Sequence, residues 1–512
     1  AGLAGAATGR RQTTRGSAAD GPSLETVAGA AGAVQRAEAT AGAAGVGTPV
    51  DVPVAAEVAQ AADDHLAAMA GKSTTKRNTG GGPLNVDIAA IAGPGGLGSE
   101  ATPDVGLASR KAQGESLQVQ LRAARFQRQQ VGGLPSISTA AVLPTDPFRQ
   151  RTSRTPGQGG GNGSPPPQTE ETIELGLAFL ARYQAPDGSW SLQGFNEDAA
   201  LSSDTAATGL ALLAFQGAGY NHREHKYQQA VRAGLDHLLK NQKADGDLFT
   251  PMDDESNRSV WLYSHSIATI ALCEAYGMTQ DPALKDPAQK AVDFIIAAQN
   301  KERGGWRYAP GVGADTSVSG WMLMALKSGE LAGLNVPPNT YLSVRKWLDG
   351  AQASATEKHL YRYNPLAPDT EAQRHGRAPT RTMTSVGLLM RLYLGWRRDN
   401  PDMVKGADYL LAAPPKLGTL REPERDTYYW YYATQVMFHM GGEKWQAWNN
   451  RLHPLLTSTQ LKQGPLAGSW DPRTPVPDRW AIHAGRLYVT TLNLLSLEVY
   501  YRHLPIYDST GR

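Results

Sequence analysis

Three side chains of the sequence have the chemistry of an acid–base site. Asp204 and Asp315 each precede a threonine and open an apolar run, and His265 stands between two serines. Two carboxylates can act as general acid and general base, and a histidine can take either part near neutral pH. In the same positions, Asp and Ser also satisfy the free backbone N–H groups of a helix N-terminus. The sequence therefore leaves catalysis and helix capping open for these residues.

The elements that must position these side chains recur along the chain. An amphipathic segment ending in Gln is followed by a loop with Gly and an aromatic residue, as in ELGLAFLARYQAPDGSW (Glu174–Trp190) and AVDFIIAAQNKERGGW (Ala291–Trp306). A copy without its glutamine falls at GADYLLAAPPKLGTL (Gly406–Leu420), which makes six units. The five glutamines, at intervals of 58, 57, 53 and 108 residues, are Gln184, Gln242, Gln299, Gln352 and Gln460.

Each unit also holds a second segment that is apolar on nearly every side, for example Asp204–Tyr220 and Asp315–Leu334. Such a pattern is typical of a helix buried all round, whereas the first segment of each pair has one apolar stripe. Six segments of each kind, in alternation, predict an all-α fold, a single α6/α6 toroid with six inner and six outer helices. The inner helices then run in one direction, and their N-termini meet at one rim.

The rim of inner-helix N-termini is the predicted ligand site. Aligned N-termini carry partial positive charge and favour an anionic or oxygen-rich ligand. The predicted rim residues are Asp204, Thr205, His265, Asp315, Thr316, Asp426 and Arg486, and the candidate catalytic residues among them are Asp204, His265 and Asp315. Inner-segment aromatic residues either line a cavity or fill the centre; they are Trp321, Tyr428, Tyr429, Trp430 and Tyr432.

The composition changes along the 512 residues. All 11 Trp and 19 Tyr lie at Tyr183 or later, and the first third is rich in Ala, Gly, Ser and Pro. Such sequence buries too little apolar surface to offset its chain entropy. We therefore predict a low-complexity, mostly disordered region over 1–156, a Gly/Pro linker over 157–168 and the toroid over 169–508.

Net charge and cysteine content exclude some classes of partner and of site. The net charge of +2 indicates no nucleic acid, and the single Cys273 excludes a disulfide framework or a multi-Cys zinc site. No cofactor or metal is predicted. No apolar run reaches the roughly 18 residues of a membrane span. Because the first residue is Ala, a signal or anchor upstream of Ala1 stays open, and so does the choice between cell envelope and cytoplasm.

The loops QAPDGSW (Gln184–Trp190) and QNKERGGW (Gln299–Trp306) resemble the QW motifs of squalene and hopene cyclases. The resemblance covers about Glu170–Tyr507 and is nearest to bacterial squalene-cyclase-like proteins with prenyltransferase/squalene oxidase repeats, as in planctomycetes. It implies the α6/α6 toroid of terpenoid cyclases. It also implies that the Gln and Trp of each loop tie outer helices together and do no chemistry.

In hopene cyclases the middle Asp of a D-x-D-D-T-A motif protonates a double bond. The resemblance places this motif on LSSDTA (Leu201–Ala206), where Ser203 takes the place of the proton donor. A serine is too weak an acid for that step. Squalene cyclisation is therefore not expected.

Three functions stay open, and whether the chain is an enzyme is uncertain. The favoured one is a non-cyclising ligand-binding or scaffold module of the bacterial cell envelope, with a small apolar or anionic ligand or a protein as partner. The second is an isoprenoid- or lipid-processing enzyme, either terpenoid cyclase or prenyltransferase-like. The third is a polysaccharide lyase or hydrolase with Asp204 and Asp315 as its carboxylates.

Overall fold

The computed structural model describes residues 148, 151, 167–195, 199–371 and 373–502. All described residues belong to one compact unit, which lies within Val54–Arg512. The predicted low-complexity region and linker lie outside the described residues, apart from Phe148, Arg151, Pro167 and Gln168. The described residues are helical and contain isolated β-bridges in place of strands.

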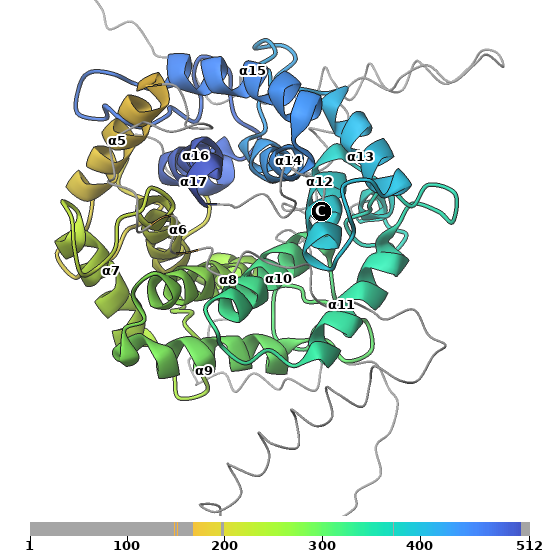
Figure 1. The fold of residues 1–512 in the computed structure, drawn as a ribbon, viewed down its shortest axis with the longest axis horizontal. Helices are drawn as coiled ribbons and strands as arrows, with labels where there is room; N and C mark the ends of the chain where they lie inside the picture. Colours follow the sequence, from red (N-terminus) through yellow and green to blue (C-terminus); the bar gives the residue numbers. More distant parts are fainter. Residues whose placement is uncertain (1–147, 149–150, 152–166, 196–198, 372, 503–512) are drawn as a thin grey trace, which may run out of the picture. The chain divides into compact units, whose positions relative to one another are not determined.

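The helices form two concentric rings, so the predicted all-α toroid with six inner and six outer helices is confirmed (Figure 1). The inner helices are α6 (Asp204–Gly217), α8 (Asp254–Thr279), α10 (Thr316–Leu331), α12 (Arg381–Tyr393), α14 (Thr427–Met440) and α16 (Ala481–Leu497). The outer helices are α5 (Pro167–Arg182), α7 (Gln228–Asn241), α9 (Pro282–Ala298), α11 (Pro338–Ala351), α13 (Pro401–Leu411) and α15 (Gly442–Thr459). A 3-10 turn, η2 (Arg374–Arg377), precedes α12, and a short α17 (Val499–Arg502) follows α16.

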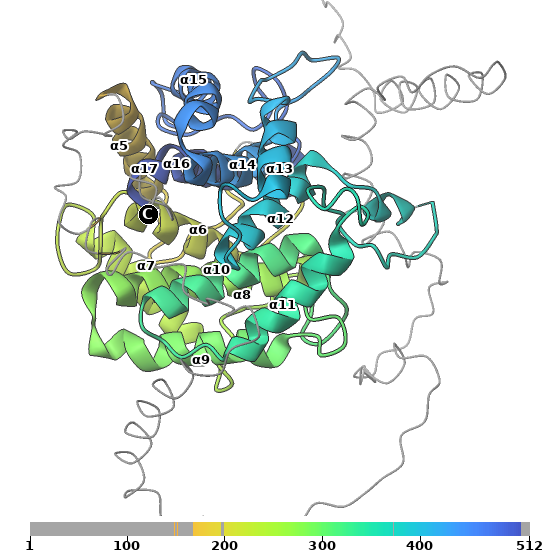
Figure 2. The same ribbon diagram turned by 45° about the vertical axis from the view of Figure 1, so that its right-hand side comes forward.

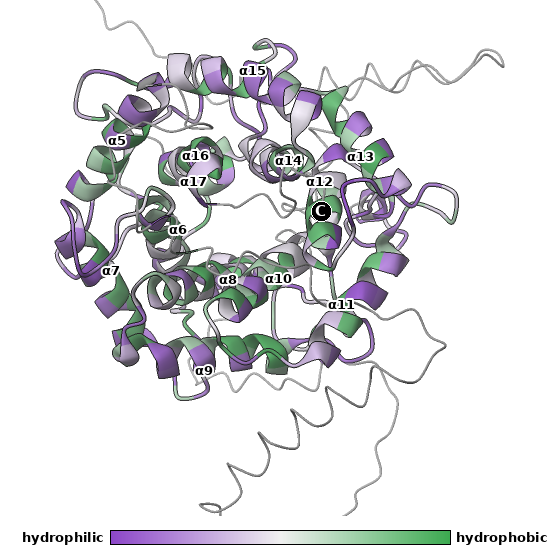
Figure 3. Cartoon of the chain, in the orientation of Figure 1, coloured by the Kyte–Doolittle hydropathy of each residue, from purple (hydrophilic) through white to green (hydrophobic). Residues whose placement is uncertain are grey.

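The helices of the two rings differ in how much of their surface is buried. In α6 every residue after Asp204 is buried, whereas α7 buries one stripe that includes Val231, Leu235 and Leu238. Figure 3 shows the same contrast, with polar residues on the outer face of the outer ring. Neighbouring inner helices contact one another around the ring, and α16 closes it against α6 (Figure 2).

The loop glutamines join one outer helix to the next. Gln184 donates from Nε2 to the carbonyl of Gly188 in its own loop, at 2.9 Å, and to Ala230 of α7, at 2.9 Å. Gln460 does the same with Gly468, at 2.9 Å, and with Thr172 of α5, at 2.8 Å. Since Thr172 lies in the first outer helix, this last glutamine closes the outer ring.

The loop glycines permit this approach. Gly246 has φ 95°, and a Cβ placed there would lie 2.1 Å from the carbonyl oxygen of Lys290 in the next outer helix. Gly468 has φ 98° and the same relation to Leu175. A side chain at either position would collide with backbone and would also occupy the left-handed region that favours glycine.

The loop tryptophans connect the outer ring to the inner ring. Trp190 donates its indole N–H to Leu180 O of α5, at 2.8 Å, and its backbone N–H to Thr208 Oγ1 of α6, at 3.0 Å. Trp306 repeats the indole bond with Ile295 O, at 2.8 Å, and the backbone bond with Ser319 Oγ, at 2.9 Å. Each loop is thus bonded to both rings.

One predicted helix start and one predicted helix cap are wrong. Helix α8 begins at Asp254, ten residues before Ser264, because Asp253 caps it by accepting from Ser256 N–H at 2.8 Å. Helix α6 is capped by Ser203, which accepts from Ala206 N–H at 3.1 Å, so Asp204 is its first helical residue and not its cap. The caps predicted at Asp315 and Asp426 are present.

Within the part of the chain that the structure describes, no helix has the length and apolar character to cross a membrane. Those same residues contain no group of three or more His, Cys, Asp or Glu side chains that could hold a metal ion.

Gln460→Ala should lower the free energy of unfolding by about 2 kcal/mol, since it removes three hydrogen bonds and leaves two carbonyls without their donor. The measurement is urea denaturation of the full chain, followed by tryptophan fluorescence.

The matched control is Gln352→Ala. Among the described residues, Gln352 bonds within its own loop, to Lys358 O at 2.9 Å and Tyr361 Oη at 3.5 Å. Its loss should cost less than about 1 kcal/mol. Equal losses for the two variants would contradict a ring-closing role for Gln460.

Candidate functional site

One face of the toroid, here called the mouth, carries the loops that lead from each outer helix into the next inner helix. Neighbouring mouth loops are bonded through the inner-helix N-termini. Thr316 donates from Oγ1 to Arg362 O at 2.6 Å, and Thr205 donates to Leu248 O at 3.3 Å. In the Asp315–Thr316 pair the aspartate caps its own helix and the threonine holds the following loop, so both residues have a structural role.

Asp315 is the most unusual acid of the mouth. It is fully buried and accepts from Val318 N–H at 2.7 Å. Its Oδ2 has no hydrogen-bond donor within the described residues and faces Arg307 Nε at 4.0 Å. Burial raises the pKa of Asp315 to about 6, although the positive charge of Arg307 acts in the opposite direction. Asp315 therefore changes its charge near neutral pH.

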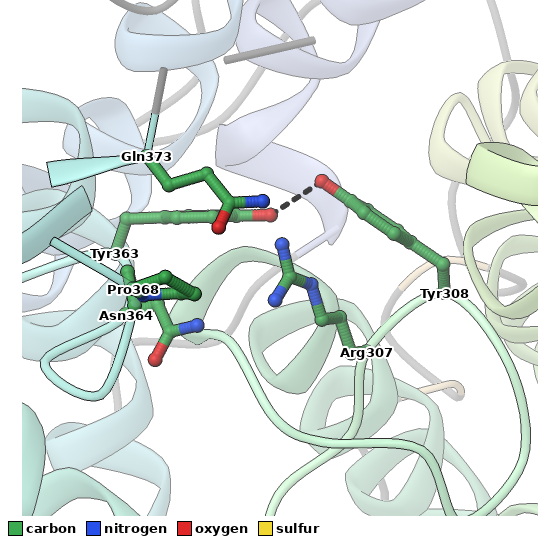
Figure 4. Close-up of a pocket in the computed structure, with 7 residues that line it drawn as sticks. Arg307, Tyr308, Tyr363, Asn364, Pro368 and Gln373 are labelled. Carbon is green, nitrogen blue, oxygen red and sulfur yellow. Dashed lines mark hydrogen bonds between the residues drawn. The ribbon is translucent and has the colours of Figure 1, made fainter. Parts of the chain in front are cut away.

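Arg307 connects Asp315 to a pocket of the mouth. The pocket is a small hollow between two mouth loops. Figure 4 shows the Arg307 guanidinium pointing toward the hydroxyls of Tyr308 and Tyr363, which are 2.5 Å apart. The lining residues are Arg307, Tyr308, Tyr363, Asn364, Ala367, Pro368 and Gln373.

The internal repeat explains how the two tyrosines meet. Trp306-Arg307-Tyr308 and Tyr361-Arg362-Tyr363 stand at equivalent places in consecutive units. The side chains of the two arginines point in different directions. Arg362 donates to Gly350 O at 3.0 Å and so faces the outer ring. Sequence reasoning missed the whole pocket, and this repeated aromatic-Arg-Tyr triplet was the signal that could have found it.

Hydroxyl groups continue from the pocket side toward the centre. Tyr263 donates to Ser317 Oγ at 2.7 Å, and Ser317 is 2.8 Å from Tyr428 Oη. Burial, and then the charge of Asp315, raise the pKa of Tyr263 and Tyr363 well above its ordinary value. These tyrosines are therefore neutral hydroxyl groups at physiological pH.

The predicted inner aromatics are all buried. Trp321 contacts Tyr432 at 5.9 Å between ring centroids, and Tyr432 contacts Tyr428 at 5.0 Å. Tyr429 points toward the outer ring, where its hydroxyl donates to Leu410 O at 3.0 Å. Trp430 is 2% exposed. Whether Trp321, Tyr428 and Tyr432 contact a ligand stays a prediction.

The rim position predicted for His265 is wrong. This residue lies inside α8 and is fully buried. Its Nδ1 accepts from Leu248 N–H at 3.1 Å and lies 3.2 Å from Asp247 Oδ1, while Nε2 is 3.1 Å from Ala291 O. His265 thus takes the place that hydroxyl groups of Thr208 and Ser319 take in other units, where they accept a loop N–H.

Arg486 and Asp426 are also bound within the fold. Arg486 lies inside α16, one residue after the kink at Gly485, is 1% exposed and pairs with Asp471 at 2.8 Å. Because the backbone at Gly485 is non-helical, Arg486 stands at the start of the regular helical stretch that follows the kink. Asp426 caps α14 by accepting from Tyr429 N–H at 2.8 Å and pairs with Arg479 at 3.3 Å.

Asp204 differs from these residues. It is partly exposed, its Oδ1 has no hydrogen-bond donor within the described residues, and burial raises its pKa. Helix α8 stands between α6 and α10 in the inner ring (Figure 1), so Asp204 and Asp315 lie on helices that are not neighbours.

Exposed apolar side chains gather on the mouth loops. Four lie in segments that lead into inner helices and the fifth, Ile482, lies in the first turn of α16; together they are called the apolar rim. Val312 and Leu366, both 57% exposed, belong to the two loops that form the pocket. The apolar rim consists of Met252, Val312, Leu366, Leu420 and Ile482.

No protein-family model matches the chain, and no curated protein matches it. Among solved structures, the chain is similar to a type II terpene cyclase from Scytonema bound to geranylgeranyl dihydroxybenzoate, at 15% identity, over 66% of this chain and 98% of that one, with a TM-score of 0.42. It is also similar to an alpha-1,6-mannanase from Salegentibacter, at 14% identity over 64% and 98%, with a TM-score of 0.43. A third is an alpha-amylase from Clostridium perfringens, at 12% identity over 64% and 97%, with a TM-score of 0.43. At these identities the likeness concerns the helical fold alone.

Asp315→Asn should change the pH dependence of stability. Because the folded chain raises the pKa of Asp315 from 3.8 to about 6, the wild type loses stability as pH rises from about 4 to about 6, by up to about 3 kcal/mol. Asparagine keeps a capping oxygen and carries no charge. The stability of the variant relative to wild type should therefore rise across this window, measured by urea denaturation at a series of pH values.

Asp253→Asn is the control with the opposite sign. At this exposed cap the Ser256 N–H holds the pKa of Asp253 below its ordinary value, so the advantage of the wild type should grow as pH rises. A difference between wild type and Asp315→Asn that is constant with pH would refute the assignment of Asp315.

Proposed function

We propose that this toroid is a non-cyclising ligand-binding module whose mouth pocket takes the anionic head of an amphiphile. The observation that carries the proposal is the placement of Arg307 beside two tyrosine hydroxyls in a polar pocket, whose two loops also carry the exposed apolar residues Val312 and Leu366.

The pocket offers donors suited to an anion. The Arg307 guanidinium is a permanent positive charge with donors in a planar fork that suits carboxylate and phosphate oxygens. The hydroxyls of Tyr308 and Tyr363 stay protonated because burial raises the pKa of both. Amides of Asn364 and Gln373 complete the polar lining.

The apolar rim supports a ligand with a hydrocarbon part. Exposed apolar side chains scattered singly need no explanation, but four of these five lie on mouth loops, and two of the four belong to the loops that form the pocket. A chain leaving the pocket would cover Val312 or Leu366 and gain roughly 25 cal/mol for each Å² of apolar surface buried.

Asp315 would adjust the charge behind the bound head group. An anion beside Arg307 disfavours the ionised form of a second carboxyl at 4.0 Å from the same guanidinium. Proton uptake by Asp315 then leaves Arg307 free for the ligand. Binding should therefore strengthen as pH falls through about 6.

The environment of Ser203 speaks against alkene protonation at that position. Its Oγ caps α6 and lies 2.7 Å from Ser264 Oγ, so it holds two helices and has no acidic proton. Placement of the module at the bacterial cell envelope stays a prediction from the sequence.

A second candidate function is an acid–base enzyme acting on an isoprenoid lipid or on a polysaccharide. The raised pKa of Asp315 favours it, because a buried carboxyl that titrates near neutral pH is suited to proton transfer. Incubation with a bacterial lipid extract and with mixed polysaccharides, followed by mass spectrometry, would reveal a product that Asp315→Asn fails to form.

Octyl phosphate is the probe for the binding function. The full chain should bind octyl phosphate more tightly than inorganic phosphate, since the octyl chain covers the apolar rim. Arg307→Gln should weaken octyl phosphate roughly ten- to a hundredfold, as expected for loss of a charged hydrogen bond of about 1.5–3 kcal/mol. Isothermal titration calorimetry measures both effects.

The matched control is Arg362→Gln, at the equivalent arginine of the next unit, which faces away from the pocket and should leave the affinity unchanged. Octyl glucoside, which has the same octyl chain and an uncharged head group, tests whether binding requires an anion. Binding of octyl glucoside as tight as that of octyl phosphate, or equal effects of the two arginine variants, would exclude an anionic head at Arg307.

A further inference from the structure

At the face opposite the mouth, one buried carboxylate holds two arginines. Glu274, in the last turns of α8, lies 2.7 Å from Arg151 Nη1 through Oε2 and 3.0 Å from Arg502 Nη2 through Oε1. The three residues are 3–5% exposed. Arg502 belongs to α17 of the toroid, whereas Arg151 precedes the first toroid helix by 16 residues. A residue from outside the rings thus completes a buried ion cluster inside them.

A second buried carboxylate acts on the same arginine. Glu498, directly after α16, is 0% exposed, and its charge acts on Arg151. Gly217 at the end of α6 makes room for it, because a Cβ there would lie 2.2 Å from Glu498 Oε2. Glu274 thus pairs with both arginines, and the charge of Glu498 favours the charged form of Arg151 as well. A buried charge without its partner is strongly destabilising.

The same segment brings an aromatic ring into a prepared space. Arg151 N–H bonds to Phe148 O at 3.1 Å, so the two residues lie on one turn, and the Arg151 guanidinium is 5.3 Å from the Phe148 ring centre. Phe148 is 4% exposed and lies over Gly277 of α8, where any Cβ would come within 2.3 Å of the ring. Because Gly277 has no side chain, it leaves the space that the Phe148 ring fills.

Arg151 is also held by backbone and by the direction of the helices. Its Nη2 donates to Arg502 O at 2.7 Å. The cluster lies where α6, α8 and α16 end, and helix C-termini carry partial negative charge that favours cations. The nearby carboxylates, the available space and the helix C-termini therefore all favour a guanidinium at this place.

We propose that the face opposite the mouth is a peptide-binding site for an aromatic residue followed three positions later by arginine, and that Phe148 and Arg151 of the same chain occupy it. The site, here called the socket, consists of Glu274, Gly277, Glu498 and Arg502. It attaches the N-terminal part of the chain to the toroid independently of the mouth pocket. The occupant is the chain's own segment, with a second copy as the alternative outcome of the test.

The first experiment vacates the socket in the full chain. The double variant Phe148→Ala/Arg151→Ala should lose several degrees of Tm, ~5 °C, because a buried carboxylate loses its cation. A fluorescent peptide of residues 144–155 should then bind the double variant at least about tenfold more tightly than the wild type, whose own segment competes at high effective concentration. Fluorescence anisotropy measures the binding.

Two controls decide whether the socket recognises this pair. A peptide carrying Arg151→Ala should bind the vacated chain at least about tenfold more weakly, and Glu274→Gln in the vacated chain should reduce binding of the unaltered peptide similarly. Equal binding of both peptides, or equal binding to wild type and vacated chain, would overturn the proposal.

The second experiment does not depend on how well the vacated variant folds. A protease site replaces residues 157–163, and the cleaved, otherwise wild-type chain is passed through gel filtration. The N-terminal fragment should stay with the toroid, and Arg151→Ala should release it. Release of the wild-type fragment would refute the socket. A dimer that becomes monomeric in Arg151→Ala would show that a second copy supplies the segment, which overturns occupation by the same chain.

Discussion

The paired hydrogen bonds of the loop glutamines are the interaction on which the rest of the structure depends. Outer helices of this chain are amphipathic and bury only one stripe, so packing alone does little to hold them to each other. Each bridging glutamine satisfies one carbonyl of its own loop and one of the next outer helix, and Gln460 reaches back to the first. Positive-φ glycines allow the close approach that these bonds need.

Closure of the ring has a consequence for function, because it brings all six outer-to-inner loops to one face. Most polar side chains of that face maintain the ring: threonines hold the following loop, aspartates cap helices, and His265 replaces a hydroxyl acceptor. The pocket arises where consecutive units depart from this pattern. Arg307 turns inward to Asp315, whereas Arg362 at the equivalent place turns toward the outer ring.

The sequence predicted the elements well and the site only in part. Two alternating hydropathy patterns were enough for twelve helices and two rings, because burial on one face or on all faces leaves a distinct periodicity. Helix starts were less certain, and α8 begins in an acidic DDE segment (Asp253–Glu255) that suggested a loop. His265 was misplaced for that reason. The sequence did not predict the pocket of Arg307, Tyr308 and Tyr363. These residues lie in loops, and loop residues have no periodicity that shows which way a side chain points.

The sequence by itself determined that the chain builds six helix pairs and that the inner members begin near Asp, Ser or Thr residues. These are local properties of composition and spacing. Only the tertiary structure decided that Asp315 titrates near neutral pH, that the tyrosines of two units meet, and that Arg151 lies against Glu274, 123 residues away in the sequence. Such properties depend on burial and on distances through space, and a linear pattern of residues records neither.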